Sequence, residues 1–244
     1  MSASSREHVD LRVATYNIHR CRGLDRLTQP ERIAAVLATI DPDVVALQEV
    51  IGPGLSGAGH AERLGAALGM GWVMAPTREL RRHQFGNAVL SRHPIRDHQQ
   101  HDLSWKTCEP RGTQRVTIDL GAGRVVQVYN VHLGTALLER RYQAERLALW
   151  IQARRGTPTL VLGDFNEWSR GFATGVLAEH LRSVDLYRHL RRRRTYPGFF
   201  PVLHLDHIYF RGDIEVRHVE LPRTRLTMVA SDHLPLVADV RIRF

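Results

Sequence analysis

The sequence predicts a layered domain of the α/β or α+β class, in which helices pack against sheets. Apolar stretches of strand length recur along the whole chain, and several are rich in valine and isoleucine. They alternate with helical patterns in the first half and dominate the second half. Stretches such as "VVAL" and "LVL" are apolar without interruption, which is typical of strands covered on both faces.

Nine segments are expected to form strands. Two of them contain the alternating patterns "RVTIDL" and "EVRHVEL", which indicate strands with one wetted face. In chain order the nine are "LRVATYNI", "DVVALQEV", "NAVLSR", "QRVTIDL", "RVVQVYNVHL", "PTLVLGDF", "LDHIYF", "IEVRHVEL" and "LPLVADVRIRF".

The first helix is expected between Thr28 and Ile40. Thr28 and Glu31 form a capping-box pattern, and Pro30 suits the first helical turn. Apolar residues then recur at helical spacing until Asp41, which precedes a proline and stops the run.

Three further helices are predicted from similar patterns. "AERLGAALG" follows a glycine-rich loop, and Gly69 is placed to end it. "LLERRYQAERLALWIQARRG" carries an apolar stripe opposite its charges, with Gly156 after the last turn. A shorter helix is expected over "GVLAEHLRSV", residues 175–184. The stripe of the long helix consists of Ala144, Leu147, Ala148 and Ile151.

The 244 residues, 43% of them hydrophobic, can bury one large core, and no break in composition divides the chain. We therefore expect a flexible N-terminal arm over residues 1–10 and a single domain over residues 11–244. The first residues lack a signal-peptide pattern, and no apolar run approaches about 20 residues. These features predict a soluble cytoplasmic protein. Cys21 and Cys108 are too few and too isolated for a disulfide framework or a zinc cluster.

The formal net charge of +9 suggests an anionic partner. Lys106 is the only lysine, so 33 of the 34 basic residues are arginine, a skew that a genome-wide coding bias also explains. Arginine nevertheless binds phosphate with two parallel hydrogen bonds, which lysine cannot do. The charge therefore permits a phosphate ligand without establishing one.

Polar side chains recur at or just past the ends of the apolar strands. Each one alone has an adequate structural explanation, such as a turn, a cap or a buried histidine with hydrogen-bond partners. Their shared position is harder to explain in that way, because strand ends of a layered domain converge on one rim. The set comprises Asn17, Glu49, Asn130, His132, Asp164, Asn166, Asp206, Asp232 and His233.

Carboxylate and amide oxygens without cysteine favour a hard cation, so Mg²⁺ or Mn²⁺ fits this set better than zinc. Glu49 is the expected anchoring ligand, with Asn17 and Asp232 helping directly or through water. An aspartate beside a cation keeps a low pKa, so Asp164 is expected to be ionised at neutral pH. A divalent cation next to histidines and a spare aspartate is suited to attack by water on a phosphorus ester.

Seven segments together resemble the endonuclease/exonuclease/phosphatase superfamily of metal-dependent phosphoesterases. In the family's order they are "TYNIH", "LQEV", "GNAVLSR", "YNVHLG", "GDFNEW", "LDHIYF" and "SDHLPL", and the resemblance runs from about Val13 to Val237. "GDFN" together with "SDHLP" is the most specific pair. The resemblance implies a four-layer αββα sandwich with two central, mostly antiparallel sheets and an active site at one rim.

The resemblance also implies a role for each candidate residue. Glu49, Asn17 and Asp232 correspond to the metal-binding positions. Asp164 resembles the aspartate that orients or deprotonates the attacking water, and Asn166 the amide that holds a phosphate oxygen. The remaining candidates are His233, which would stabilise charge on phosphorus, Asp206, which would orient His233, and His132, which would contact phosphate or assist the leaving oxygen.

The expected function is hydrolysis of a phosphodiester by a Mg²⁺-dependent enzyme, with Mn²⁺ as a substitute and nucleic acid as the leading substrate. A phospholipid headgroup or a soluble phosphomonoester is the alternative within the same chemistry, since one fold hosts several activities. A basic nucleic-acid-binding module without catalysis is the alternative from another class.

Two arginine features stay open at this point. Arg111 is as easily an exposed loop residue as a phosphate contact. The run Arg191–Arg194, followed by Tyr196, Phe199 and Phe200, suits a nucleic-acid strand, a membrane surface or a packed loop. A solvated charge run is the simpler explanation.

Overall fold

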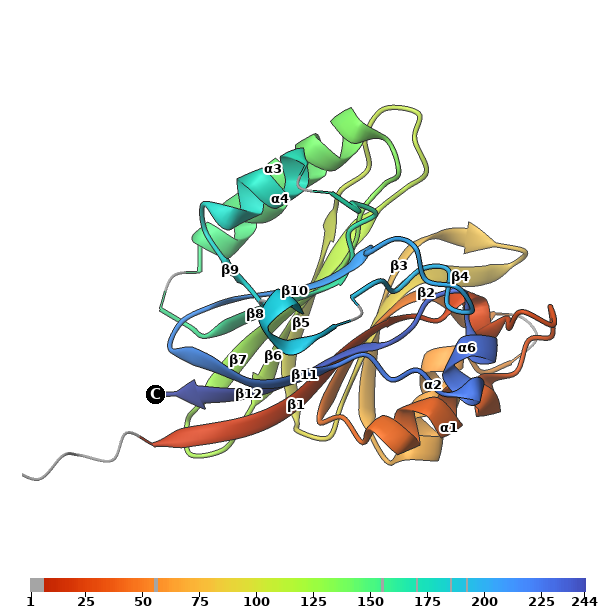
Figure 1. Ribbon diagram of the computed structural model, residues 1–244, viewed down its shortest axis with the longest axis horizontal. Helices are drawn as coiled ribbons and strands as arrows, with labels where there is room; N and C mark the ends of the chain where they lie inside the picture. The colour runs from red at the N-terminus through yellow and green to blue at the C-terminus, as the bar shows by residue number, and fades with distance from the viewer. Residues whose placement is uncertain (1–6, 55–56, 155, 170, 185, 192) are drawn as a thin grey trace, which may run out of the picture.

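Two six-stranded sheets lie face to face, and helices cover both outer faces (Figure 1). The computed structural model describes the whole chain except residues 1–6, 55, 56, 155, 170, 185 and 192. The arrangement confirms the predicted four-layer αββα sandwich. In the described part of the chain, no helix is both long and apolar enough to cross a membrane.

The first sheet has the strand order β11-β12-β1-β2-β4-β3, and only β1 and β2 run parallel. Its strands are β1 (His8–Asn17), β2 (Val44–Gly54), β3 (Gly71–Leu80), β4 (His83–Ser91), β11 (Ile214–Glu220) and β12 (Leu236–Arg243). The second sheet has the order β5-β6-β7-β8-β10-β9, and only β7 and β8 run parallel. Its strands are β5 (Ile95–Asp102), β6 (Gly112–Asp119), β7 (Val125–His132), β8 (Thr159–Asp164), β9 (Arg182–Ser183) and β10 (Asp206–Arg211).

The helices form the two outer layers. α1 (Pro30–Ile40) and α2 (His60–Leu68) pack on the first sheet, and α6 (Arg225–Ala230) contacts α1. α3 (Leu137–Gln152) and α4 (Phe172–Ala178) pack together on the second sheet, at the top of Figure 1. Two short helices, η1 (His19–Cys21) and α5 (Leu186–His189), complete the described elements.

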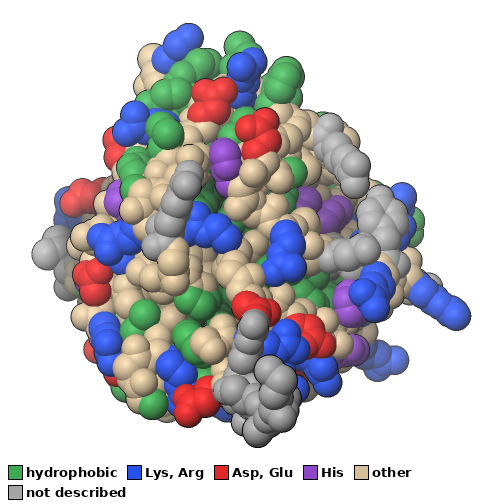
Figure 2. All heavy atoms as spheres, turned by 90° about the vertical axis from the view of Figure 1, so that its left-hand side faces the viewer, with side chains coloured by type: hydrophobic (Ala, Val, Ile, Leu, Met, Phe, Trp, Pro, Cys, Tyr) green, Lys and Arg blue, Asp and Glu red, His purple; other side chains and the backbone are tan. Residues whose placement is uncertain are grey.

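The end of the molecule where β1 begins and β12 ends carries both basic and acidic side chains (Figure 2). Arg241 pairs with Asp10 at 2.7 Å, and Arg243 pairs with Asp213 at 3.4 Å. In these two pairs the opposite charges offset one another.

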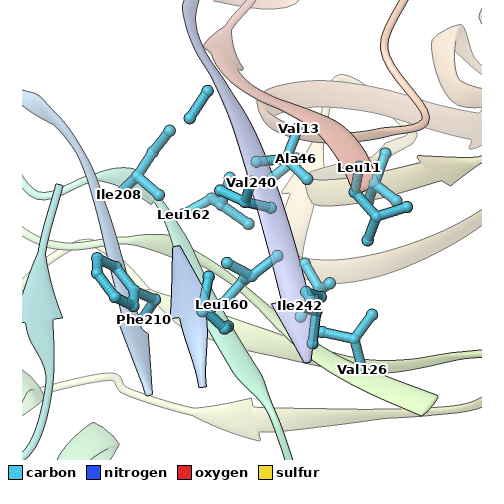
Figure 3. Close-up of a cluster of buried hydrophobic side chains, with 14 of the residues drawn as sticks. Leu11, Val13, Ala46, Val126, Leu160, Leu162, Ile208, Phe210, Val240 and Ile242 are labelled. Atoms are coloured by element: carbon cyan, nitrogen blue, oxygen red, sulfur yellow. The ribbon is translucent and has the colours of Figure 1, made fainter. Parts of the chain in front are cut away.

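The largest core lies between the two sheets (Figure 3). Strand β8 shows why its sequence is apolar without interruption: Leu160 and Leu162 point into this core, whereas Val161 packs beneath α3 and α4. Successive side chains of a strand face opposite sides, so a central strand covered on both faces needs apolar residues at every position.

All nine predicted strands are present, but β3, β5 and β9 were not predicted. Each of the three is the outermost strand of its sheet. Most side chains of β5 are exposed, and those of β3 are mainly half-buried or exposed. Outermost strands bury little, so their sequences need not show the apolar pattern on which the prediction depended.

The helix predictions need three corrections. α1 runs from Pro30 to Ile40 and stops at Asp41, as expected, and Asp41 has a left-handed conformation, but the N-cap is Gln29 and no side chain caps it. Thr28 precedes the N-cap by one residue, so it cannot form the predicted capping box with Glu31. It instead forms an isolated β-bridge with Arg22. The predicted helix over 175–184 is α4, which starts and ends earlier, and Arg182–Ser183 instead pair with β10.

The third correction concerns α3, which ends at Gln152 and not immediately before Gly156. The predicted stripe of that helix is buried as expected. The predicted N-terminal arm is too long, because residues 8–10 belong to β1 and pair with β12. Glu7 is also placed, since its backbone oxygen accepts from the N–H of Phe244 at 3.1 Å, and residues 1–6 lie outside the described residues.

Candidate active site

Strand register brings three of the candidate residues into one row. His132 ends β7 opposite Asp164 at the end of β8, and Asp164 in turn lies opposite Asp206 at the start of β10. Asn17 ends β1 in the other sheet, and β1 contacts β8 across the sandwich. The site therefore forms at one rim, where the carboxyl ends of the two parallel strand pairs meet.

Asp164 lies at the centre of this group. Its Oδ2 accepts a hydrogen bond from Asn17 Nδ2 at 3.1 Å and lies 3.6 Å from His132 Nε2 and 3.7 Å from His233 Nε2. Its Oδ1 accepts the backbone N–H of Asn166 at 2.9 Å. Only 1% of the residue is exposed, so its carboxylate is held almost entirely by protein groups.

Asp206 fixes His233. Its Oδ2 lies 2.9 Å from His233 Nδ1, and the residue is fully buried. Burial by itself lowers the pKa of His233, but the negative charges of Asp206 and Asp164 outweigh it and raise that pKa to about 10. His233 is therefore an imidazolium at neutral pH, with Nε2 directed toward Asp164.

His132 has the opposite character. Burial, with the positive charges of Arg111 and His233, lowers its pKa well below the usual value for histidine. The two histidines beside Asp164 thus differ in charge, one neutral and one cationic. Such a division suits two different roles in proton transfer and charge stabilisation.

The protein groups around Asp164 raise its pKa. Burial and the charge of Asp206 together outweigh His233 and the hydrogen bonds from Asn166 and Asn17, and the resulting pKa is about 6. The loss of solvent is the largest of these effects. The carboxyl group remains mostly ionised at pH 7.

The three expected metal ligands lie at the same rim. Asn17 Nδ2 lies 3.4 Å from Glu49 Oε1, and the Oγ of Ser231 donates to the backbone oxygen of Asn17, which places Asp232 next to β1. The side chains of Glu49 and Asp232 are 25% and 30% exposed. Both are therefore reachable by a hydrated ion.

Among the described residues, no three His, Cys, Asp or Glu side chains lie close enough to form a metal cluster. The candidate set instead has two carboxylates and the amide of Asn17, whose Nδ2 faces Glu49 and whose Oδ1 accepts the backbone N–H of His19 at 3.1 Å. This composition fits Mg²⁺, which keeps several waters and takes few protein ligands, and it does not fit a structural zinc site.

Two of the site residues predicted from the sequence adopt left-handed backbone conformations. Asn166 has a φ of 50°, which asparagine tolerates, and its Nδ2 donates to the backbone oxygen of Leu133 at 2.9 Å. Glu49 has a φ of 56°, which is uncommon for glutamate. Backbone strain of this kind often occurs at functional sites, where the surrounding fold holds a side chain in a required direction.

The sequence did not single out two basic residues that the structure adds to the site. His19 Nδ1 lies 3.6 Å from Asp232 Oδ1, and Arg20 Nε lies 3.9 Å from Glu49 Oε2. The basic segment after Asn17 was the available signal, but the sharp turn of η1 that directs these side chains back to the rim was not predictable from it.

Arg111 and Tyr196 also belong to the site. Arg111 Nη1 lies 3.5 Å from His132 Nδ1, and its side chain is only 10% exposed, so it is not the exposed loop arginine considered from the sequence. The Tyr196 ring lies 4.9 Å from the His233 ring. Burial and the charges of Asp232, Asp164 and Glu49 raise the pKa of Tyr196.

Asn130 does not join the site, although the sequence placed it among the strand-end polar residues. It is fully buried, donates to the backbone oxygens of Leu47 and Ala88, and accepts from Gln48 Nε2. Its role is to connect the sheets. Of the arginine run, Arg192 lies outside the described residues, and the other three line a cavity next to the site.

Comparisons with known proteins identify the family. The profile of the Endonuclease/Exonuclease/phosphatase family matches residues 14–233. The chain is 32% identical to YbhP, an uncharacterized protein of Escherichia coli K12, over 97% of this chain and 98% of YbhP.

Two solved structures share the fold. An endonuclease/exonuclease/phosphatase of Beutenbergia cavernae is 25% identical with a TM-score of 0.74, over 96% of this chain and 72% of that protein. The mannosyl-6-phosphatase Bt3783 of Bacteroides thetaiotaomicron has a TM-score of 0.79 at 18% identity, over 94% of this chain and 99% of its own.

These matches span nearly the whole chain and agree with the geometry of the rim. Members of this family are hydrolytic phosphoesterases and generally use divalent metal ions. The chain belongs to the endonuclease/exonuclease/phosphatase family.

Proposed function

We propose that the protein is a Mg²⁺-dependent phosphodiesterase that acts on nucleic acid. The observation that carries this proposal is the buried Asp164 carboxylate, whose Oδ2 is shared by Asn17, neutral His132 and cationic His233. A carboxylate in this position can accept a proton from water, and the histidines beside it can serve the phosphate.

The residues divide the work of hydrolysis. Asp164 orients the attacking water and takes its proton as the new oxygen–phosphorus bond forms. The imidazolium of His233, held by Asp206, stabilises the charge that develops on the non-bridging oxygens. His132 and Asn166 contact the phosphate or the leaving oxygen as the bond to that oxygen breaks.

Glu49, Asp232 and Asn17 are the residues that would hold Mg²⁺. When bound there, the ion supplies positive charge to the phosphate oxygens. Arg20 Nε lies 3.9 Å from Glu49 Oε2, so this carboxylate already has a cationic group beside it.

The test is hydrolysis of bis(p-nitrophenyl) phosphate and of p-nitrophenyl phosphate, each with Mg²⁺, Mn²⁺ or EDTA. We expect metal-dependent cleavage of the diester, and a loss of about 100-fold or more in kcat for both Asp164→Ala and His233→Ala. The exposed residues Asp10 and His98 provide matched controls, Asp10→Ala and His98→Ala, whose rates should stay within about twofold of the unaltered protein.

Cleavage of the monoester alone would replace the proposal with a phosphatase, the activity named for the Bacteroides thetaiotaomicron structure. Turnover that continues in EDTA would exclude the role assigned to Mg²⁺.

A further inference from the structure

A cavity of about 680 Å³ lies beside the candidate active site, between residues 190, 191, 193, 194, 200 and 201 on one side and Leu221 and Leu234 on the other. Among the described residues that line it, four are arginines and none is an aspartate or glutamate. Its volume is within the range of about 300–1,000 Å³ that is typical of ligand sites. The arginines are Arg191, Arg193, Arg194 and Arg223.

Three of the four arginines of this cavity differ from most others on the surface. Arg63, Arg96 and Arg217 each pair with a carboxylate at 2.7–2.8 Å. Among the residues that the structure describes, Arg191, Arg194 and Arg223 have no such ion pair. Guanidinium groups that are gathered without acidic partners repel one another, so a ligand with several negative charges would stabilise this arrangement.

The cavity adjoins the catalytic residues through a short stretch of backbone. Leu234 directly follows His233, and its N–H donates to the backbone oxygen of Thr195 at 2.8 Å. Tyr196, two residues after Arg194, packs its ring against His233. Gly198 N–H donates to the backbone oxygen of Asp232 at 2.6 Å. One face of the segment 194–198 thus borders the catalytic rim and the other borders the arginines.

Two aromatic side chains lie exposed on the same segment. Phe199 is 56% exposed and Phe200 is 66% exposed, and Phe200 also lines the cavity. Exposed rings beside arginines are the features with which proteins bind single strands, because unpaired bases stack on the rings while guanidinium groups bind the phosphates. A duplex offers no free base faces to such rings.

We propose that this arginine cavity, with Phe199 and Phe200, binds the strand that flanks the scissile bond in single-stranded nucleic acid. The inference rests on the proposed phosphodiesterase function and adds the substrate class. The forked geometry of arginine matches phosphate oxygens, and the concave shape suits a flexible strand.

The test measures binding of fluorescein-labelled 12-nucleotide dT and U strands by anisotropy with Mg²⁺ present, with His233→Ala in every chain to prevent cleavage. The triple variant Arg191→Gln/Arg194→Gln/Arg223→Gln should weaken binding about 30-fold or more and reduce the slope of log Kd against log salt concentration by about two. Phe199→Ser/Phe200→Ser should weaken binding with the slope unchanged.

The matched control is Arg63→Gln/Arg96→Gln/Arg217→Gln, which removes the same charge from arginines that pair elsewhere. It should change the affinity by less than about threefold. Equal weakening by both triple variants would overturn the site, as would the absence of strand binding. If the triple variant Arg191→Gln/Arg194→Gln/Arg223→Gln lost binding to phosphatidylglycerol vesicles but retained strand binding, the cavity would be assigned to a membrane surface instead. Hydrolysis of bis(p-nitrophenyl) phosphate, measured with His233 intact, tests the catalytic proposal independently.

Discussion

At the scale of single residues, the Asp206–His233 pair makes the most direct prediction. We expect Asp206→Asn to lower kcat on bis(p-nitrophenyl) phosphate about 100-fold with little change in KM, because His233 would lose its fixed orientation and much of its positive charge. Nitrogen NMR should show the pKa of His233 falling from about 10 in the same variant. An unchanged kcat together with a lowered pKa would show that the charge of His233 is not required.

His60 predicts how stability depends on pH. It is buried with Nδ1 3.3 Å from Cys21 Sγ, and burial, with Arg63 and His83, lowers its pKa to about 4. The unfolded chain takes up a proton at this histidine near pH 6.5, before the folded protein does. The contribution of His60 to the free energy of unfolding is therefore fully present above pH 6.5. As the pH falls from 6.5 toward 4, the protein loses about 3 kcal/mol of stability through this residue.

Urea unfolding at pH 7.5 and at pH 4.5 measures this contribution. His60→Leu should lose less stability between the two pH values than the unaltered protein, whereas His98→Leu, which changes an exposed histidine, should lose as much. Parallel losses in all three proteins would assign the acid sensitivity to other groups.

The sequence placed the proposed catalytic and metal residues at strand ends, and the fold brings them to one rim, although their roles stay predictions. The sequence did not indicate the contacts that loops between the strands make with the site. Arg111 lies in a loop before β6 and Tyr196 in a loop before β10, and neither has a local pattern that distinguishes it from other loop residues. Only packing, which brings Arg111 to His132 and Tyr196 to His233, reveals them.

At the scale of elements, burial decides which strands the sequence could predict. Central strands such as β8 must be apolar on both faces, so their pattern is unmistakable. β3 and β5 are held mainly by backbone hydrogen bonds to one neighbouring strand. Most residue types can form such backbone hydrogen bonds, so the sequence of these strands is weakly constrained. Their formation depends on the finished neighbouring strand, and local sequence does not encode it.

The pairing of β7 with β8 makes a prediction about Gly163. A Cβ atom there would lie 1.9 Å from the backbone oxygen of Val131, its partner in the parallel register. Gly163→Ala should force the strands apart, lower the free energy of unfolding by about 3 kcal/mol or more, and reduce kcat at least tenfold, because His132 and Asp164 are the next residues. Gly175→Ala is the control, since its Cβ meets nothing within 4 Å. Equal stability of the two variants would show that the strands tolerate the side chain.

At the scale of the whole molecule, the candidate active site depends on how the two sheets are held together. One rim contains proposed site residues from both sheets, so a shift of one sheet against the other would separate Asn17 from Asp164. The apolar core between the sheets resists separation but does not by itself fix the alignment, because hydrophobic contacts are not directional. Directional contacts across the sandwich are therefore the features that set the geometry of the rim.

Asn130 provides such contacts and makes the last prediction. From β7 it donates to Leu47 at 2.9 Å and to Ala88 at 2.8 Å in the other sheet, and it accepts from Gln48 Nε2 at 2.8 Å, all without solvent. Asn130→Leu should lower the free energy of unfolding by about 3 kcal/mol, because it leaves the Gln48 amide and two carbonyl groups without these partners.

Urea unfolding of Asn130→Leu, Gln48→Leu and the double variant tests the link as a double-mutant cycle. In Asn130→Leu the Gln48 amide is buried without its partner, and this should account for part of the loss in the free energy of unfolding. The double variant should therefore be more stable, by about 1 kcal/mol or more, than the sum of the two single losses implies. Additive losses would mean that the two side chains act independently. Because Gln48 directly precedes Glu49, the same cycle followed by bis(p-nitrophenyl) phosphate hydrolysis should show coupled losses in kcat, as expected if sheet alignment holds Glu49 in place.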